Sequence, residues 1–222
     1  MKGLDGLSVL AGTPWLRSDS LERGYLHPYS QAELAVFACA VPADFRFIVR
    51  APALVTSVFM HDRRGRSGGL NKTFLNVAAA SAFVKSCVDG LGEKLGAVLF
   101  DFGPYPASQM KSLSGSQKAI EEISAIAEGL TRAPAVCAAT DPLDPNCCLA
   151  GPLIVRWHCS GPLSPPFVQE PERKRAGDPV TRTLIASLVM RAVRSGVPAY
   201  VLAGDDAEGD APAKGLGRLA DH

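Results

Sequence analysis

Several charged side chains stand where apolar segments of this sequence end. Arg50 ends the first strong apolar segment, Asp101 lies late in another, and Asp205 follows the last one. Arg156 and His158 are two residues apart, so in a strand they would share a face. Two converging guanidinium groups can bind a phosphate or a carboxylate through paired hydrogen bonds. These residues predict a small anionic ligand at the strand ends, provided that the strands are parallel neighbours.

Structural roles are the alternative for the acidic members of this set. Asp101 could simply pair with Arg50 or Arg156, because a charge in a protein interior usually needs an opposite partner. Glu208 could serve as an acid or a base, but it stands in a segment rich in Gly and Asp, where a solvated carboxylate is the simpler interpretation. Whether the chain is an enzyme stays open at this point.

Two basic clusters suggest a second hypothesis, in which the chain binds nucleic acid. They lie in segments that we expect to be loops, and they comprise Arg63, Arg64 and Arg66 in the first and Arg173, Lys174 and Arg175 in the second. If both contacted phosphates, the affinity would fall steeply with salt. Solvated loops are the alternative. The 23 Lys and Arg residues nearly balance the 22 Asp and Glu residues, so no global field favours a polyanion.

The residue types that bind metals and cofactors are sparse in this sequence. The four histidines are His27, His61, His158 and His222, and no two of them are spaced as a helical ligand pair. The six cysteines contain no Cys-x-x-Cys motif, so we expect no metal, no cofactor and no disulfide framework. A Ser-His-Asp set stays possible, although the Gly-x-Ser-x-Gly turn of many hydrolases is absent.

The elements that position these residues alternate between strand and helix. Apolar and β-branched segments predict strands at residues 45–50, 95–102, 135–138, 153–158 and 199–203. Helical spacing predicts helices at 30–42, at 74–88 with Gly90 as its end, from 120 onwards and at 178–196, with a loop at 61–69. This order implies right-handed βαβ units and a parallel sheet in which 45–49 and 97–102 are adjacent. The pattern alone leaves a barrel and an open doubly wound sheet as alternatives.

The size and the hydropathy of the chain limit its class. Its 222 residues are consistent with a single domain. No apolar run approaches the roughly 20 residues of a membrane span, and the first residues include an early acid without a long apolar stretch, so we expect a cytoplasmic protein without membrane contact. Residues 204–222, rich in Gly, Asp and Ala, predict a partly flexible tail.

Three stretches resemble the YecE-like family, also known as domain of unknown function 72. Residues 41–56 contain Pro-x-x-Phe-x-Phe-x-Val-Arg, which is similar to a strand motif of that family that ends in Lys. Residues 71–102 resemble its next helix and strand, and residues 152–158 and 207–212 resemble its last two strand ends. The resemblance extends over most of the chain from about Glu33. It implies a TIM-barrel-like α/β fold with a site at the carboxyl ends of the strands.

The sequence also departs from the family pattern. The opening Gly-Thr-Ser-x-Trp strand is reduced to residues 12–15, the next strand leaves at most a remnant near Tyr25, and the central Glu-x-Arg strand has no counterpart. Arg50, Asp101 and Asp205 stand where the family has Lys, Gln and one of a pair of Asn. We therefore expect a shortened or incomplete barrel, divergent over roughly its first 30 residues. A degenerate scaffold without activity is the third functional alternative.

Overall fold

The computed structural model of the chain describes residues 17–62, 65–102, 118–123, 125, 135–137, 152–157 and 179–203. The chain divides into two compact units, Met1–Ala139 and Thr140–His222, and we describe each by itself. The single domain expected from the sequence stays a prediction. The expected remnant at residues 12–15 and the expected flexible tail at 204–222 lie outside the described residues.

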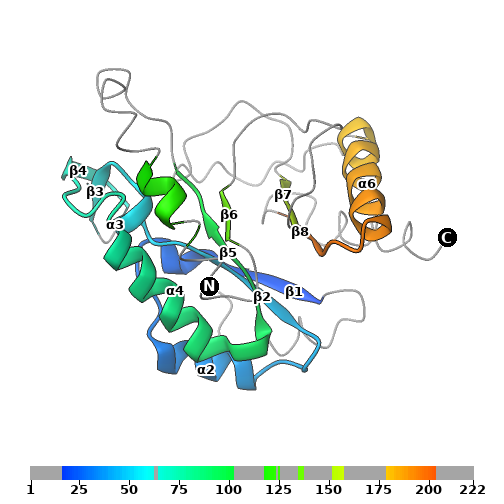
Figure 1. Cartoon of the computed structure of the whole chain (residues 1–222), viewed down its shortest axis with the longest axis horizontal. Helices are drawn as coiled ribbons and strands as arrows, with labels where there is room; N and C mark the ends of the chain where they lie inside the picture. Colours follow the sequence, from blue (N-terminus) through cyan, green and yellow to red (C-terminus); the bar gives the residue numbers. More distant parts are fainter. Residues whose placement is uncertain are drawn as a thin grey trace. The chain divides into compact units, whose positions relative to one another are not determined.

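The first unit is built on a parallel sheet of four strands in the order β1-β2-β5-β6 (Figure 1). The strands are β1 (Ser18–Leu21), β2 (Arg46–Arg50), β5 (Leu95–Phe100) and β6 (Ala135–Cys137). The predicted neighbours β2 and β5 pair in parallel, with Val49 opposite Val98 and Arg50 opposite Leu99. Every residue of β5 is buried, as expected for a strand of a parallel sheet that is covered on both faces. The predicted parallel sheet is thereby confirmed.

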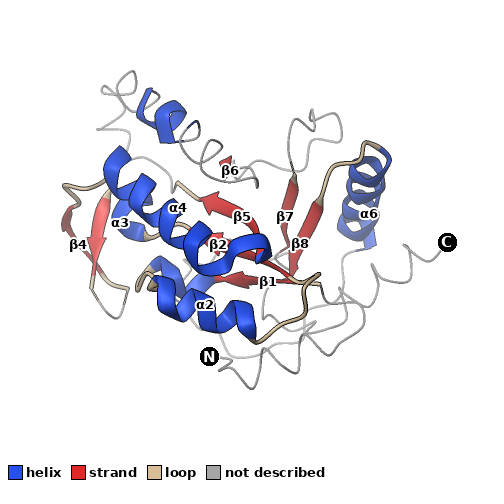
Figure 2. Cartoon of the chain, turned by 60° about the horizontal axis from the view of Figure 1, so that its bottom comes forward, coloured by secondary structure: helices blue, strands red, loops and turns tan. Residues whose placement is uncertain are grey.

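Helices connect these strands and cover one face of the sheet. The connections contain η1 (Glu22–Tyr25) and α2 (Gln31–Cys39) before β2, and α3 (Ala53–Thr56), α4 (Val77–Leu91) and η2 (Gly92–Lys94) before β5. Helices α2 and α4 lie side by side (Figure 2). Ser30 caps α2 as predicted, because its hydroxyl accepts the Glu33 amide while the Glu33 carboxylate accepts the Ser30 amide. These hydrogen bonds lower the pKa of Glu33.

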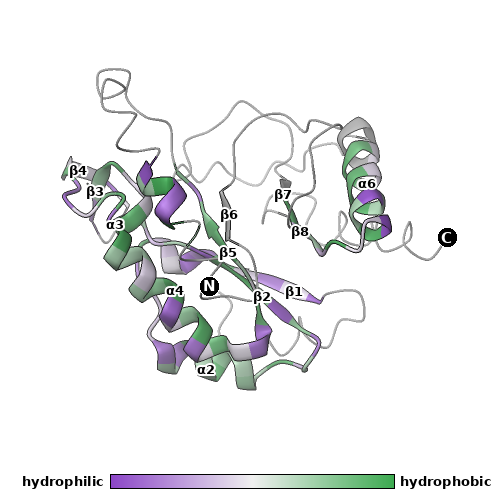
Figure 3. Cartoon of the chain, in the orientation of Figure 1, coloured by the Kyte–Doolittle hydropathy of each residue, from purple (hydrophilic) through white to green (hydrophobic). Residues whose placement is uncertain are grey.

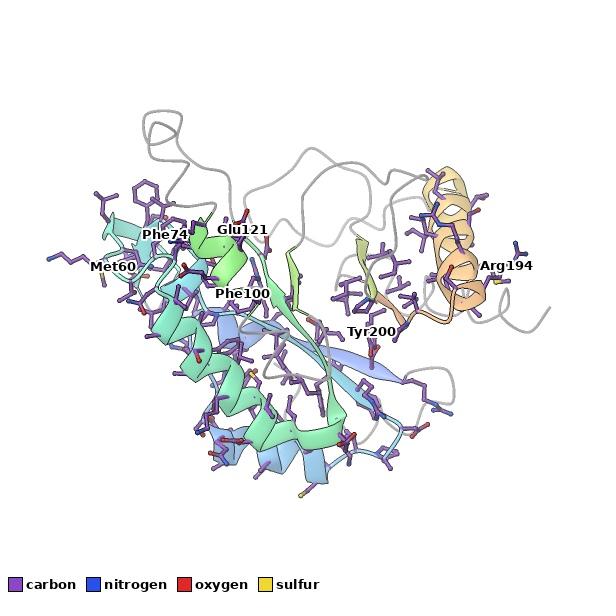
Figure 4. The ribbon with its side chains drawn as sticks, in the orientation of Figure 1. Met60, Phe74, Phe100, Glu121, Arg194 and Tyr200 are labelled. Atoms are coloured by element: carbon purple, nitrogen blue, oxygen red, sulfur yellow. The ribbon has the colours of Figure 1, made fainter. Side chains whose placement is uncertain are left out.

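The core of this unit lies between the sheet and the two helices. Alternate residues of β2, among them Phe47 and Val49, point into it, and Phe100 of β5 does the same. Phe100, labelled in Figure 4, meets the ring of Phe83 from α4 edge-on, with 6.5 Å between the ring centroids. Ile48 on the opposite face of β2 is also fully buried. This burial anchors the strand ends that carry the polar side chains described below.

Gly90 has a different role from the one predicted. It does not end α4 but lies inside it, buried at the contact with α2. A Cβ atom at this position would lie 2.6 Å from Cβ of Leu34 and 2.8 Å from the carbonyl oxygen of Gln31. The last residue of the helix is Leu91, and Gly92 follows as its C-cap, with a φ of 54° that is readily adopted only by glycine. Gly90 therefore allows the close contact between α4 and α2, and Gly92 allows the chain to leave the helix.

Gly90→Ala tests the close approach of α4 to α2. We expect a loss of roughly 1–3 kcal/mol in unfolding free energy, because the added methyl group has to push the helices apart. Gly69→Ala is the matched control, since no atom lies within 4 Å of a Cβ atom at that glycine, and it should change stability by less than about 0.5 kcal/mol. Urea unfolding followed by circular dichroism measures both. Equal stabilities of the two variants would contradict this role of Gly90.

Two features of the first unit were not predicted from the sequence. Strand β1 was missed because its four residues, Ser18–Leu21, are mostly polar, and Figure 3 colours it as hydrophilic, in contrast to β5. The segment expected to be a loop at residues 61–69 overlaps an antiparallel hairpin of β3 (Phe59–His61) and β4 (Ser67–Leu70), which takes in both of its ends. All four residues of β4 are exposed, so burial gives no periodic signal there.

The second unit contains a βαβ arrangement. Strands β7 (Leu153–Trp157) and β8 (Ala199–Ala203) pair in parallel, and α6 (Pro179–Arg194) connects them in sequence. Ile185 of α6 is fully buried and packs with Val155 of β7. Both strands and the helix agree with the elements predicted from apolar patterning. The helix expected from residue 120 onwards is present at residues 118–123 in the first unit.

The described strands form one sheet of four strands and two sheets of two strands. Within the described residues these sheets do not close into a barrel. The structure therefore establishes an α/β fold with parallel strands, which is the coarser part of the predicted fold class. In the same part of the chain, each helix is either too short or too polar to cross a membrane.

The thiols of Cys39 and Cys87 are both free but differ in exposure. Cys39 is exposed at the end of α2, whereas Cys87 is buried in α4, and burial raises its pKa to about 12. We expect iodoacetamide at pH 8 to label Cys39 and to spare Cys87, because the thiolate is the reacting form. Peptide mass spectrometry before and after addition of urea measures the difference. Labelling of both cysteines at one rate in the native protein would contradict the packing of α4.

Candidate functional site

Three polar side chains meet at the carboxyl edge of the parallel sheet. Glu22 follows β1, Arg50 ends β2, and Asp101 follows β5. The three strands are neighbours and run in the same direction, so their carboxyl ends lie at one edge. Ligand sites of open and closed α/β sheets form at this edge. We call this group, together with Tyr25 of η1, the Arg50 cluster.

The guanidinium of Arg50 is held by both carboxylates and by an aromatic ring. Its Nη2 donates to Oδ2 of Asp101 at 2.8 Å, and its Nη1 donates to Oε2 of Glu22 at 3.3 Å. The Cζ atom lies 4.0 Å from the centroid of the Tyr25 ring, which is a cation–π contact. Asp101 is the closer partner and also the less exposed one, with 15% of its side chain exposed against 38% for Glu22. The pair of Arg50 with Asp101, which we call the inner pair, is therefore stronger than the pair of Arg50 with Glu22.

The charges of the Arg50 cluster do not cancel. One guanidinium faces two carboxylates, so the group carries one net negative charge when all three are ionised. Glu22 is further oriented by Ser20, whose hydroxyl donates to its Oε1 at 2.7 Å. The Nε atom of Arg50 is buried, and within the described residues it has no hydrogen-bond acceptor. The guanidinium thus keeps unused donor capacity at a site with excess negative charge.

The predicted ligand-binding residues are brought together only in part. Arg50 and Asp101 form a pair, which is the structural role that the sequence analysis gave as the alternative for Asp101. Arg156 lies in β7, but its side chain is outside the description, as are residues His158, Asp205 and Glu208. The convergence of a second arginine on Arg50 stays a prediction.

Sequence reasoning missed two members of the cluster, Glu22 and Tyr25. Both come directly after β1, and the failure to recognise that strand hid the position of Glu22 at a strand end. A signal did exist, because the resemblance placed the remnant of a family strand near Tyr25. A charged or aromatic residue directly after any strand that pairs with β2 would have been a candidate.

The basic loop residues add little positive surface where they are described. Arg66 donates from its backbone amide and from Nε to the carboxylate of Asp62, at 2.9 Å and 2.8 Å. This pair lies in the connection between β3 and β4, with 75% of the Arg66 side chain exposed. The other five residues of the two clusters, Arg63, Arg64, Arg173, Lys174 and Arg175, lie outside the described residues.

The described residues offer no cluster of metal ligands. Their His, Cys, Asp and Glu side chains form no group of three or more that could hold a metal ion. The Arg50 cluster contributes only two carboxylates, and both are engaged with a guanidinium. Its donor set therefore suits hydrogen-bonding and ionic recognition better than metal coordination.

Comparison with solved structures identifies the fold. A DUF72 family protein from Enterococcus faecalis V583, solved at 2.52 Å, matches 98% of this chain and 94% of its own, with a TM-score of 0.67 at 11% sequence identity. The chain shares the fold of a DUF72 family protein. A second crystal structure from that organism, at 3.10 Å, matches with a TM-score of 0.55 at 12% identity, over 99% of this chain and 94% of its own. The resemblance to the YecE-like family is thereby confirmed at the level of the fold.

Two other comparisons gave no match. No family profile matches this sequence, and no curated protein matches it either. At 11% and 12% identity the structural likeness is evidence for the fold alone. The likeness therefore assigns no function to this chain.

The two ion pairs of Arg50 should differ in their contribution to stability. Asp101→Asn should lower the unfolding free energy by roughly 1.5–3 kcal/mol, because it weakens a short, mostly buried, charge-assisted hydrogen bond. Glu22→Gln should cost less than about 1 kcal/mol, because an exposed ion pair contributes little. Urea unfolding of both variants at pH 7 gives the comparison. A larger loss for Glu22→Gln would reverse the order of the two pairs.

Proposed function

We propose that the Arg50 cluster binds the anionic group of a small ligand, such as a phosphate or a carboxylate. The observation that carries the proposal is the fixed guanidinium at the carboxyl edge of three parallel strands. Asp101 and Tyr25 hold it on two sides, and Glu22 engages its Nη1 atom. A pre-oriented guanidinium binds planar or tetrahedral anions with little loss of side-chain entropy.

Glu22 is the group that such a ligand would replace. Its contact with Arg50 is longer than that of Asp101, and its side chain is more exposed. An incoming anion that takes over the Nη1 atom would leave the Arg50–Asp101 pair in place. In the free protein the Glu22 carboxylate therefore occupies the position that the anionic group of the ligand would take. It competes with the ligand for the Nη1 atom of Arg50.

Because the cluster carries a net negative charge, the proposal predicts opposite effects on anion binding for two substitutions. A bound anion has to approach two carboxylates, so removal of the charge on Glu22 should strengthen anion binding. Loss of the guanidinium should abolish it. A cluster that serves stability alone would not couple these two substitutions to any ligand.

We further propose that the chain is a shortened member of the YecE-like family and that its strands belong to an incomplete TIM-barrel-like fold. The parallel order of β1, β2, β5 and β6, the likeness over nearly the whole chain and the motif at residues 42–50 support this assignment.

Nucleic-acid binding by the basic clusters stays a prediction. Arg66, their one described residue, is already paired with Asp62, and this pairing argues against a phosphate contact there.

Thermal unfolding in increasing inorganic phosphate tests the ligand proposal. With sodium chloride matched for ionic strength, we expect phosphate to raise the midpoint of the unmutated protein, because a ligand of the native state stabilises it. The increase should be larger for Glu22→Gln. It should vanish in the double variant Arg50→Gln/Asp101→Asn, which removes both charges of the inner pair and leaves no buried charge unpaired. An unchanged phosphate response in the double variant, or a smaller one in Glu22→Gln, would overturn the proposal.

A further inference from the structure

A serine and a histidine outside the Arg50 cluster form a pair with the geometry of an activated nucleophile. Ser57 follows α3, and His61 is the last residue of β3. The hydroxyl Oγ of Ser57 lies 2.9 Å from Nε2 of His61, and Nδ1 of His61 lies 3.2 Å from the carbonyl oxygen of Gly65. A carbonyl oxygen can only accept, so Nδ1 carries a proton.

This assignment fixes the direction of the second hydrogen bond. In the neutral imidazole with a proton on Nδ1, Nε2 has a lone pair and accepts the hydroxyl proton of Ser57. The arrangement is that of a nucleophile and its general base, with a backbone carbonyl in the orienting position that a carboxylate often holds. The amide of Phe59 donates to Oγ of Ser57 at 3.3 Å and orients the hydroxyl further.

Two neighbouring features bear on acyl transfer, a pocket beside His61 and the backbone amide that follows Ser57. His61 lines an open pocket of about 510 Å³, together with Met60, Asp62, Arg66, Ser67 and Gly68. The amide of Val58, the residue after the serine, donates to no acceptor within the described part of the chain. In hydrolases of several folds, the amide that follows the nucleophile stabilises the developing oxyanion.

We propose that Ser57 is a nucleophile activated by His61 and that it hydrolyses small carboxylic esters that enter from the pocket beside His61. Oγ attacks the ester carbonyl carbon while its proton passes to Nε2 of His61. The C–O bond to the alcohol then breaks, and His61 returns the proton to the departing alkoxide. A water molecule releases the acyl group from Ser57 by the same two proton transfers, which restores the free enzyme. The proposal does not rest on the anion site proposed at Arg50.

A fluorophosphonate probe tests the nucleophile directly in the full chain. The hydroxyl of Ser57 should displace fluoride from phosphorus and form one stable adduct, which peptide mass spectrometry locates. Ser57→Ala should abolish the adduct, and His61→Gln should slow its formation by about 100-fold or more, because a general base contributes that much. Ser187→Ala removes an exposed serine of α6 and should leave labelling unchanged.

A second readout separates loss of chemistry from loss of folding. The unmutated protein should hydrolyse p-nitrophenyl acetate with a pre-steady-state burst, and Ser57→Ala should lose the burst while it keeps the same thermal midpoint within a few degrees. Labelling at a residue other than Ser57, labelling that does not depend on His61, or no labelling and no hydrolysis at all would overturn the proposal.

Discussion

The parallel pairing of β2 with β5 is the constraint on which the first unit depends. The middle of β2 and the whole of β5 are buried, so their backbone groups have to find partners within the sheet. The register places Val49 opposite Val98 and Arg50 opposite Leu99. The ladder continues past the end of β2, where the amide of Ala51 donates to the carbonyl of Leu99 at 2.8 Å. Arg50 therefore ends level with the last residues of β5, and Asp101 follows within reach of its guanidinium. A slip by one residue would turn Arg50 to the other face of the sheet.

The opposite end of the sheet carries the contacts that hold the helices. Lys94, the residue before β5, donates from Nζ to the backbone carbonyls of Ala38 and Val41 around the end of α2. A cation at this position satisfies carbonyls that the helix leaves unpaired and interacts favourably with the helix dipole. Gly90 brings α4 against the other end of α2, at Gln31 and Leu34. Structural contacts thus gather before β5 and polar side chains after it, which is the usual division in α/β proteins.

Most of the regular elements could be predicted from the sequence because burial imposes an apolar pattern on them. Strand β5 and helix α6 are long enough for burial to impose an apolar pattern. Strand β1 and the β3–β4 hairpin are short and polar or exposed, and tertiary pairing alone holds them in place. Arg50 and Asp101 could be found because they end predicted strands. Glu22 could not, because its strand was not recognised, and the pairing of Ser57 with His61 depends on a turn that no periodicity encodes.

Tyr25 connects the two candidate sites of the first unit. One face of its ring receives the Arg50 guanidinium at 4.0 Å, and its centroid lies 6.1 Å from that of the His61 ring. A substitution of Tyr25 would therefore disturb both groups and could not assign a function to either. Glu22 and Ser57 are more informative positions, because each contacts one group and not the other in the interactions described above. A ligand effect that responds to Glu22 alone belongs to the strand ends, and a covalent reaction that responds to Ser57 alone belongs to the turn before the hairpin.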